Sequence, residues 1–271
     1  MNRKILASPY IVWALGFIIL PLFMILYYGL TDGSGAFTLE NVLAIADPVH
    51  YKAFGNSLMM ALCSTVICLV IAYPLAYILS QHEGKVSNTI IMLFILPMWI
   101  NFLLRVLAMQ MLLSNTGIIN ALLGFFGLPA QRIMYTKGAI LIGMVYDYLP
   151  FMILPIYNVM SKIDKDVIEA AQDLGATVFV TFRKIIVPLS LPGVISGVTM
   201  VFIPSMSEFV VADILGGSKI LLLGNVIEQE FNLSNNWNLG SGLSIVLMVF
   251  ILISMAVMNR SKAEEGDTML W

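Results

Sequence analysis

The chain has 271 residues, of which 59% are hydrophobic and only 11% are charged, and its formal net charge is −2. Ordinary soluble domains carry about 25% charged residues. These numbers exclude a typical water-soluble enzyme or binding module and predict a protein whose solvent is membrane lipid. The near-neutral net charge gives no electrostatic reason to expect nucleic acid as a partner.

Six stretches are long and apolar enough to cross a bilayer as helices, which takes roughly 20 residues each. The first stretch follows Arg3 and Lys4 as a secretory signal would, but its apolar run is too long for one and no clean cleavage site follows. We therefore expect an all-α membrane protein with one transmembrane domain over 1–271. The expected spans are about 9–30, 54–80, 88–113, 138–160, 189–211 and 239–258.

Basic residues in the connections predict the orientation. With the N-terminus inside, nine Lys and Arg residues lie on the inner side and four on the outer side. Membrane proteins keep the excess of Lys and Arg in the cytoplasm, so we expect both termini there. The inner set is Arg3, Lys4, Lys85, Lys162, Lys165, Arg183, Lys184, Arg260 and Lys262, and the outer set is Lys52, Arg132, Lys137 and Lys219.

Two outer connections carry apolar patterns. From 115 to 137 the apolar residues recur at helical spacing, which predicts a short amphipathic helix in the outer interface. The run from Ile220 to Leu223 is too short to span, so it either dips back into the bundle or caps it.

The sequence offers no metal site and no catalytic residue. Cys63 and Cys68 are five residues apart, roughly 140° around a helix, and are expected to be separate thiols facing lipid or core. His50 and His82 both fall in expected connections, without a metal-ligand or nucleophile motif beside them.

The connection between the fourth and fifth spans, 161–188, is unusually charged and helix-forming. Asp164 or Asp166 can cap a first helix, and Gly175 permits the left-handed turn that ends one. A second helical piece, 177–186, is expected to carry Phe179, Phe182 and Ile186 on one stripe, before Pro188 opens the next span. This segment is either a place where a soluble partner docks or a solvated loop whose amphipathic pattern arose by chance.

The spacing Glu-Ala-Ala, three residues, Gly, nine residues, Ile-x-x-Pro resembles the permease loop of ABC importers that work with a separate binding protein. Val187 stands where that family usually has Leu. The resemblance implies a type I permease fold and a coupling helix that contacts a cytoplasmic ATPase. It also implies that ATP and Mg²⁺ are bound by that partner and no cofactor by this chain, which agrees with the absence of a phosphate-loop motif. The coupling residues implied are Glu169, Ala170, Ala171, Asp173, Gly175, Ile185 and Pro188.

Further stretches resemble the B-type subunit of spermidine/putrescine permeases. That resemblance implies a multi-pass protein of the bacterial plasma membrane. It implies as partners a second, different permease subunit, two ATPase copies and an extracellular polyamine-binding protein. The stretches are 96–101 with Arg105, 115–117 with Asn120, 132–136, 148–152, 216–219 and 223–227.

Ionisable groups inside a bilayer cost about 2.5–3.5 kcal/mol on insertion scales, so each needs a partner or a role. Arg105 and Asp147 are expected at similar depths, roughly 12–14 Å from the outer ends of the third and fourth spans. Either they pair across adjacent helices, or Asp147 faces the pathway and meets a substrate ammonium group.

The fifth span is expected to carry Gly193, Gly197, Pro204 and Glu208 on one stripe. The small residues favour close approach of a neighbouring helix, and Pro204 should kink or loosen the span. Asp213, at the mouth of that span, is either a solvated acid or part of a cation site.

A polyamine has several ammonium groups on apolar stems, so its site should combine carboxylates with aromatic faces. The candidate path residues are Trp99, Tyr146, Asp147, Tyr148, Phe151, Glu208, Phe209 and Asp213. Together these observations predict a permease subunit of an ATP-driven importer of polyamines that is not itself an enzyme. The alternatives are an ABC permease for another small solute and an ion-coupled secondary transporter.

Overall fold

The structure is a computed structural model that describes residues 9–10, 12–81 and 85–268, with the backbone alone for 85–88, 259 and 261–268. In the described part of the chain the regular elements are helices, apart from one isolated bridge between Thr31 and Phe37. Six helical stretches there are long and apolar enough to cross a membrane, which confirms the expected fold class and number of spans. They are Val12–Gly29, Pro48–Gln81, Phe102–Phe125, Lys137–Met160, Val178–Met206 and Trp237–Met258. Of the residues used to predict orientation, Arg3, Lys4 and the side chains of Lys85 and Lys262 lie outside the described residues.

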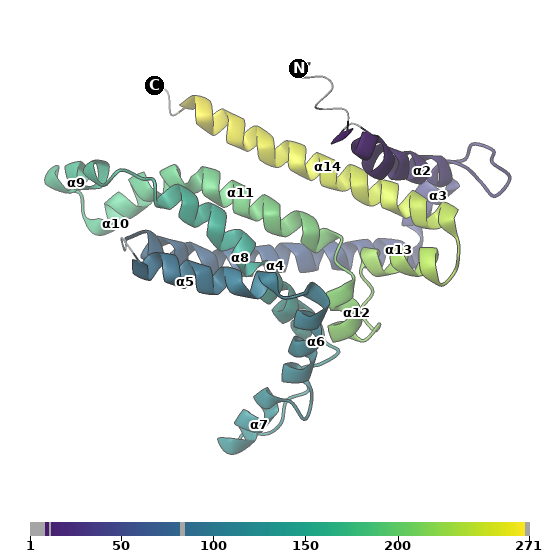
Figure 1. Ribbon diagram of the computed structural model, residues 1–271, viewed down its shortest axis with the longest axis horizontal. Helices are drawn as coiled ribbons and strands as arrows, with labels where there is room; N and C mark the ends of the chain where they lie inside the picture. The colour runs from purple at the N-terminus through teal and green to yellow at the C-terminus, as the bar shows by residue number, and fades with distance from the viewer. Residues whose placement is uncertain (1–8, 11, 82–84, 269–271) are drawn as a thin grey trace.

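Three long helices form the centre of the bundle. α8 (Lys137–Met160) packs against both α4 (Pro48–Gln81) and α11 (Val187–Met206), which also contact each other, as Figure 1 shows. Their shared core includes Met144 and Met152, both fully buried. In lipid, helices associate through close packing because burying apolar surface brings no advantage over the lipid tails.

The remaining long helix lies along one side of this centre. α14 (Trp237–Thr268) packs against α2 (Leu20–Gly29), and the two run alongside each other in Figure 1. α14 continues ten residues beyond the expected end at 258. Short helical turns, α3 (Glu40–Leu43) and η2 (Ala44–Ala46), lead from α2 into α4, which begins six residues before the expected position 54.

The expected third span, 88–113, is not one helix. α5 (Lys85–Ile95) contacts α8 and passes into a 3-10 turn, η3 (Leu96–Trp99). After it, α6 (Phe102–Leu113) leaves in a different direction and α7 (Ile118–Phe125) follows it away from the bundle (Figure 1). The expectation of a continuous third span was therefore wrong.

Local chemistry explains this break. Pro97 lies in the 3-10 turn, and the backbone at Ile100 is extended, with φ −78° and ψ 140°. The Asn101 side chain then caps α6 by accepting hydrogen bonds from the backbone N–H groups of Leu103 and Leu104, at 2.9 and 3.4 Å. These Pro and Asn signals outweigh the continuous apolar composition of the segment.

The fifth span also differs from expectation at both ends. α11 ends at Met206, and Glu208 lies in the connection to α12 (Val210–Gly216), so the prediction that Glu208 continues the helical stripe was wrong. At its other end α11 continues without interruption from α10 (Val178–Thr181) through a π-helical turn, η4 (Phe182–Ile186). The second helical piece of the connection is therefore an extension of the fifth helix.

The glycines of the fifth span do allow a close helix contact. A Cβ atom added at Gly193 would lie 2.8 Å from the backbone oxygen of Pro155, and one at Gly197 would lie 2.8 Å from the Met152 sulfur. Both neighbours belong to α8. The small residues therefore bring α11 and α8 together, as the stripe predicted.

The patterned outer connections form short helices. α7 follows the expected amphipathic segment, and the buried Asn120 side chain closes the loop behind it by hydrogen bonding with Ser114 and Gln131. The run ending at Leu223 leads into α13 (Leu223–Asn232), and its last two residues, Leu222 and Leu223, are fully buried. There the Leu223 backbone N–H donates to the Ser57 hydroxyl of α4 at 2.8 Å.

Candidate functional site

The motif-bearing connection forms the expected capped helix. α9 (Lys165–Asp173) begins after Asp164, whose carboxylate accepts a hydrogen bond from the Asp166 backbone N–H at 3.1 Å. It ends before Gly175, whose φ of +85° lies in the left-handed region. Because a residue with a Cβ atom rarely adopts that angle, Gly175 fixes where the chain turns back.

The surface of this segment is open. Glu169, Ala170 and Asp173 are exposed and Ala171 is half-buried, so all four motif positions on α9 can be reached from outside. Beside them Leu174 is 90% exposed. Val178 and Phe179, which follow within five residues, are 71% and 70% exposed, and several large exposed apolar side chains in one segment favour a contact surface more than a single one does.

The other end of the motif is tied into the bundle. Phe182 packs edge-on against the rings of Tyr77 and Tyr73, with ring centroids 5.2 and 6.1 Å away. The Tyr73 hydroxyl lies 2.8 Å from the Ser190 hydroxyl of α11. The motif residues Ile185 and Pro188 are half-buried in this region.

The expected stripe of Phe179, Phe182 and Ile186 is only partly formed. Phe179 is 70% exposed, whereas Ile186 is only 4% exposed. The π-helical turn at 182–186 adds a residue to the turn and so shifts the faces on its two sides relative to each other. Phe179 therefore belongs to the exposed surface of α9 and α10, and the other two side chains belong to the bundle.

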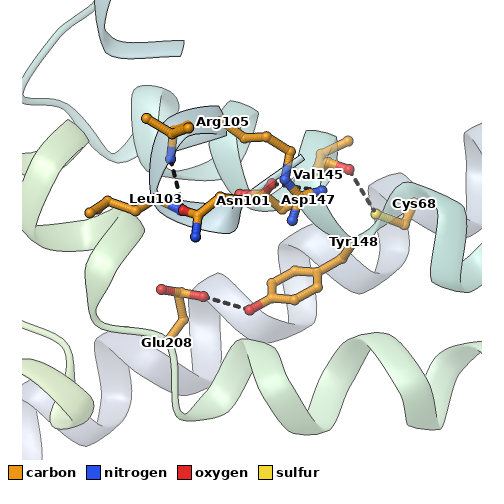
Figure 2. A network of polar contacts seen from close by, with 9 residues as sticks. Cys68, Asn101, Leu103, Arg105, Val145, Asp147, Tyr148 and Glu208 are labelled. Atoms are coloured by element: carbon orange, nitrogen blue, oxygen red, sulfur yellow. Dashed lines mark hydrogen bonds and ion pairs between the residues drawn. The ribbon is translucent and has the colours of Figure 1, made fainter. Parts of the chain in front are cut away.

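A second group of polar side chains is buried between α6, α8 and the connection to α12, and we call it the buried network: Arg105, Asp147, Tyr148 and Glu208 (Figure 2). Arg105 Nη1 lies 3.4 Å from Asp147 Oδ1, with side-chain exposures of 9% and 3%. Arg105 also lies over the Phe102 ring, 5.8 Å from its centroid. This places the two predicted intramembrane charges side by side.

The contact between these two charges is loose. Among the described residues neither Arg105 Nε nor Nη1 nor Asp147 Oδ1 has a hydrogen-bond partner. Charge-assisted N–H···O bonds are normally about 2.7–2.9 Å long, and Arg–carboxylate pairs are frequently bidentate. The pair at 3.4 Å is therefore an electrostatic contact without that geometry.

Glu208, in contrast to Asp147, is held by several hydrogen bonds. The Tyr148 hydroxyl donates to Glu208 Oε2 at 2.5 Å. Glu208 Oε1 accepts hydrogen bonds from the backbone N–H groups of Phe209 and Val211, at 3.1 and 3.0 Å. Glu208 thus caps the start of α12 and joins it to α8, and both of its oxygens are occupied.

The remaining candidate path residues are less buried than this network. Trp99 is 79% exposed, Tyr146 40% and Phe209 39%, while Phe151 is half-buried. Asp213 is exposed and accepts a hydrogen bond from the Ser218 hydroxyl at 2.8 Å. The structure thus brings Asp147, Tyr148 and Glu208 together in one buried group and leaves Trp99 and Asp213 exposed.

A cavity of about 560 Å³ beside Phe209 is lined by polar residues that the sequence does not single out. Glu228, Phe231 and Asn232 of α13 line it, and the Asn232 side chain donates to Glu228 Oε1 at 2.8 Å. The signal was present in the sequence as an acid and an aromatic residue three positions apart. Two such residues in a connection carry no periodicity or motif that predicts a cavity lining.

Comparison with known proteins identifies the family. Residues 72–262 match the family model described as binding-protein-dependent transport system inner membrane component. The chain is 40% identical to the spermidine/putrescine transport system permease protein PotB of Haemophilus influenzae, covering 96% of this chain and 93% of that one. It is 38% identical to PotB of Escherichia coli strain K12, covering 92% and 94%.

Solved structures share the fold. A bacterial alginate ABC transporter in complex with an alginate pentasaccharide-bound periplasmic protein matches with a TM-score of 0.77 at 15% identity, covering 95% of this chain and 92% of that chain. The MetNI methionine ABC transporter in an inward-facing conformation matches with a TM-score of 0.58 at 18% identity, covering 81% and 99%. The fold is that of type I ABC importer permeases, and the chain belongs to the family of binding-protein-dependent transport system inner membrane components, which are multi-pass proteins of the inner membrane.

Proposed function

We propose that this chain is the transmembrane permease subunit of an ATP-driven importer of polyamines such as spermidine and putrescine. The observation that carries the proposal is the identity of 37–40% to spermidine/putrescine permeases over more than nine-tenths of the chain. The specific sequence stretches described above point to the same substrates.

The working transporter would contain four further subunits. A second, different permease subunit would complete the path, two ATPase subunits would bind ATP and Mg²⁺, and an extracellular polyamine-binding protein would deliver the substrate. In this arrangement the α9 end of the bundle and both termini are cytoplasmic, and residues 1–271 act as one domain. The chain itself makes and breaks no covalent bond.

Energy would enter through α9. The exposed motif residues Glu169 to Gly175 are suited to contact the ATPase, and Ile185 and Pro188 anchor the helix that follows. When the ATPase pair closes on ATP, movement of α9 would pass through α10 and η4 into α11. The contact of Phe182 with Tyr73 and Tyr77 would carry the same movement into α4.

The substrate would pass between acids and aromatic rings. Ammonium groups are attracted to carboxylates and to aromatic faces, and Asp147, Glu208 and Asp213 are the acids proposed along the path. The aromatic residues proposed to flank the methylene stems are Trp99, Tyr146, Tyr148, Phe151 and Phe209. Substituting Glu208→Gln and Asp213→Asn singly should reduce uptake while the complex still assembles, and unchanged uptake in both variants would contradict these assignments.

The proposal is tested by purifying the chain together with whatever ATPase binds it. Spermidine or putrescine, presented with the binding protein, should increase the ATPase rate of the reconstituted complex. A complex that forms but does not respond to either polyamine would contradict the substrate assignment and leave a permease for another solute. Uptake that persists without an ATPase would instead favour an ion-coupled secondary transporter.

A further inference from the structure

The buried network contains two acids that differ in how they are held. Glu208 has three donors, Tyr148 Oη and the backbone N–H groups of Phe209 and Val211, so its carboxylate is fully engaged in joining α8 to α12. An incoming ammonium group would have to break these hydrogen bonds to reach it. Asp147 has no such set of donors, and its Oδ1 atom has no hydrogen-bond partner among the described residues.

The cation beside Asp147 is held just as weakly. The Nε and Nη1 atoms of Arg105 are buried without a hydrogen-bond partner among the described residues, and the guanidinium approaches Asp147 no closer than 3.4 Å. Buried charges are stable only when they are paired and hydrogen-bonded. A carboxylate that is paired but poorly bonded gains more from a cation that can reach it at hydrogen-bonding distance.

Arg105 also lies on a different helical element from α5, the helix that precedes it in the chain. It lies in α6, which is divided from α5 by the extended backbone at Ile100 and the cap at Asn101. Asp147 lies in the middle of α8, within the packed centre of the bundle. A shift of α6 against α8 therefore moves Arg105 away from Asp147 without unwinding either helix.

We propose that Asp147 is the ammonium-binding carboxylate of the path and that Arg105 is an internal cation that occupies it until a substrate alkylammonium group takes its place. This inference rests on the proposed polyamine function. A primary ammonium group has three N–H donors on a narrow, flexible stem. It can donate a hydrogen bond to the Oδ1 atom, which the guanidinium at 3.4 Å does not.

The test uses the full complex, with the second permease, the ATPase pair and the binding protein, reconstituted in proteoliposomes. Uptake of putrescine and spermidine and the half-saturating concentration of each are measured for Arg105→Gln, Asp147→Asn and the double variant. Arg132→Gln is the matched control, because it removes the same charge from an exposed loop. Assembly of each variant is checked by co-purification with the ATPase.

Asp147→Asn should lose uptake on the order of tenfold or more, because a charge-assisted hydrogen bond to the substrate is lost. Arg105→Gln should lower the half-saturating polyamine concentration several-fold, because the competing cation is gone. The double variant decides the question. A pair with a purely structural role can be replaced by two neutral amides, so recovery of uptake to within about twofold of wild type overturns the inference.

A double variant as impaired as Asp147→Asn alone supports it. If Asp147→Asn does not assemble, Arg105→Gln decides instead, and a half-saturating concentration unchanged from wild type overturns the inference. A wild-type complex that takes up neither polyamine overturns the proposed function, and this inference falls with it. If the wild-type complex takes up polyamine and the double variant recovers that uptake, the inference is overturned but the proposed function stands.

Discussion

The α9 segment and the buried network both place acids beside large apolar side chains, but with opposite exposure. On α9 the acids Glu169 and Asp173 are exposed next to Leu174. In the buried network Glu208 and Asp147 are enclosed, and their contacts come from within the chain. The first arrangement can be reached from outside the chain, whereas the second joins helices of one subunit. Similar residue types are therefore open to a partner in one region and enclosed by the chain's own helices in the other.

The largest expected effect comes from reversing a charge on the exposed surface. Glu169→Arg should reduce ATP-driven polyamine uptake about tenfold or more. The substitution places a positive charge at a contact that we propose is complementary to a carboxylate, and this should weaken binding of the ATPase. The ATPase rate should then no longer depend on transport. Glu40→Arg, the same change on an exposed helix at the other end of the bundle, is the control and should transport normally. Normal uptake by Glu169→Arg would show that α9 is not the docking surface.

In the buried network we expect a substitution to lower the stability of the purified complex. Tyr148→Phe removes the donor to Glu208 Oε2, which should cost about 1–3 kcal/mol because a buried carboxylate oxygen is left without its partner. Thermal unfolding of the purified complex measures this. Tyr146→Phe, the same change at a neighbouring ring that is 40% exposed, should leave the unfolding temperature unchanged. Equal effects at both positions would mean that the hydrogen bond to Glu208 does not hold α8 to α12.

The close contact between α8 and α11 predicts that two glycine substitutions change the stability of the protein in opposite directions. Gly193→Ala places a Cβ atom 2.8 Å from the backbone oxygen of Pro155, and overpacking of this kind costs about 1–3 kcal/mol. Gly55→Ala adds a Cβ atom with no neighbour within 4 Å, inside α4, and should stabilise by up to about 1 kcal/mol. Unfolding temperatures that move in the same direction for both variants would contradict the close approach.

The smallest expected effect is at the turn after α9. Gly175→Ala has open space for its Cβ atom but must adopt φ +85°, at a cost of roughly 1–2 kcal/mol. We expect the exposed segment to become more sensitive to a protease while the bundle keeps its unfolding temperature. Unchanged cleavage would show that the turn does not depend on glycine.

The α9 segment and the buried network were predictable from the sequence to different degrees. The residues that define the first are close together in sequence, and those that define the second are far apart. The helix at α9 follows from neighbouring residues, since Asp164 caps it and Gly175 ends it within a dozen positions. The hydrogen bond between Tyr148 and Glu208 joins residues 60 positions apart. Only the packing of α8 against the start of α12 brings them together, so no local pattern could have revealed it.

The break in the third span was missed for a different reason. Pro97 and Asn101 carried local signals for a break, and both act in the structure. A rule based on the length of an apolar run ignores such signals, because the whole segment is hydrophobic enough to span. The expected number of six was nevertheless right by length and composition, with 102–125 as the third apolar stretch.

The central claim is that an ATPase docked at α9 drives this permease. Spermidine and putrescine uptake into proteoliposomes, measured with and without the ATPase subunits and ATP, tests it most directly. We predict uptake only when the ATPase, ATP and the binding protein are all present, and loss of that uptake in Glu169→Arg while the variant remains assembled. Uptake that continues without the ATPase, or that is unaffected in Glu169→Arg, would contradict the account.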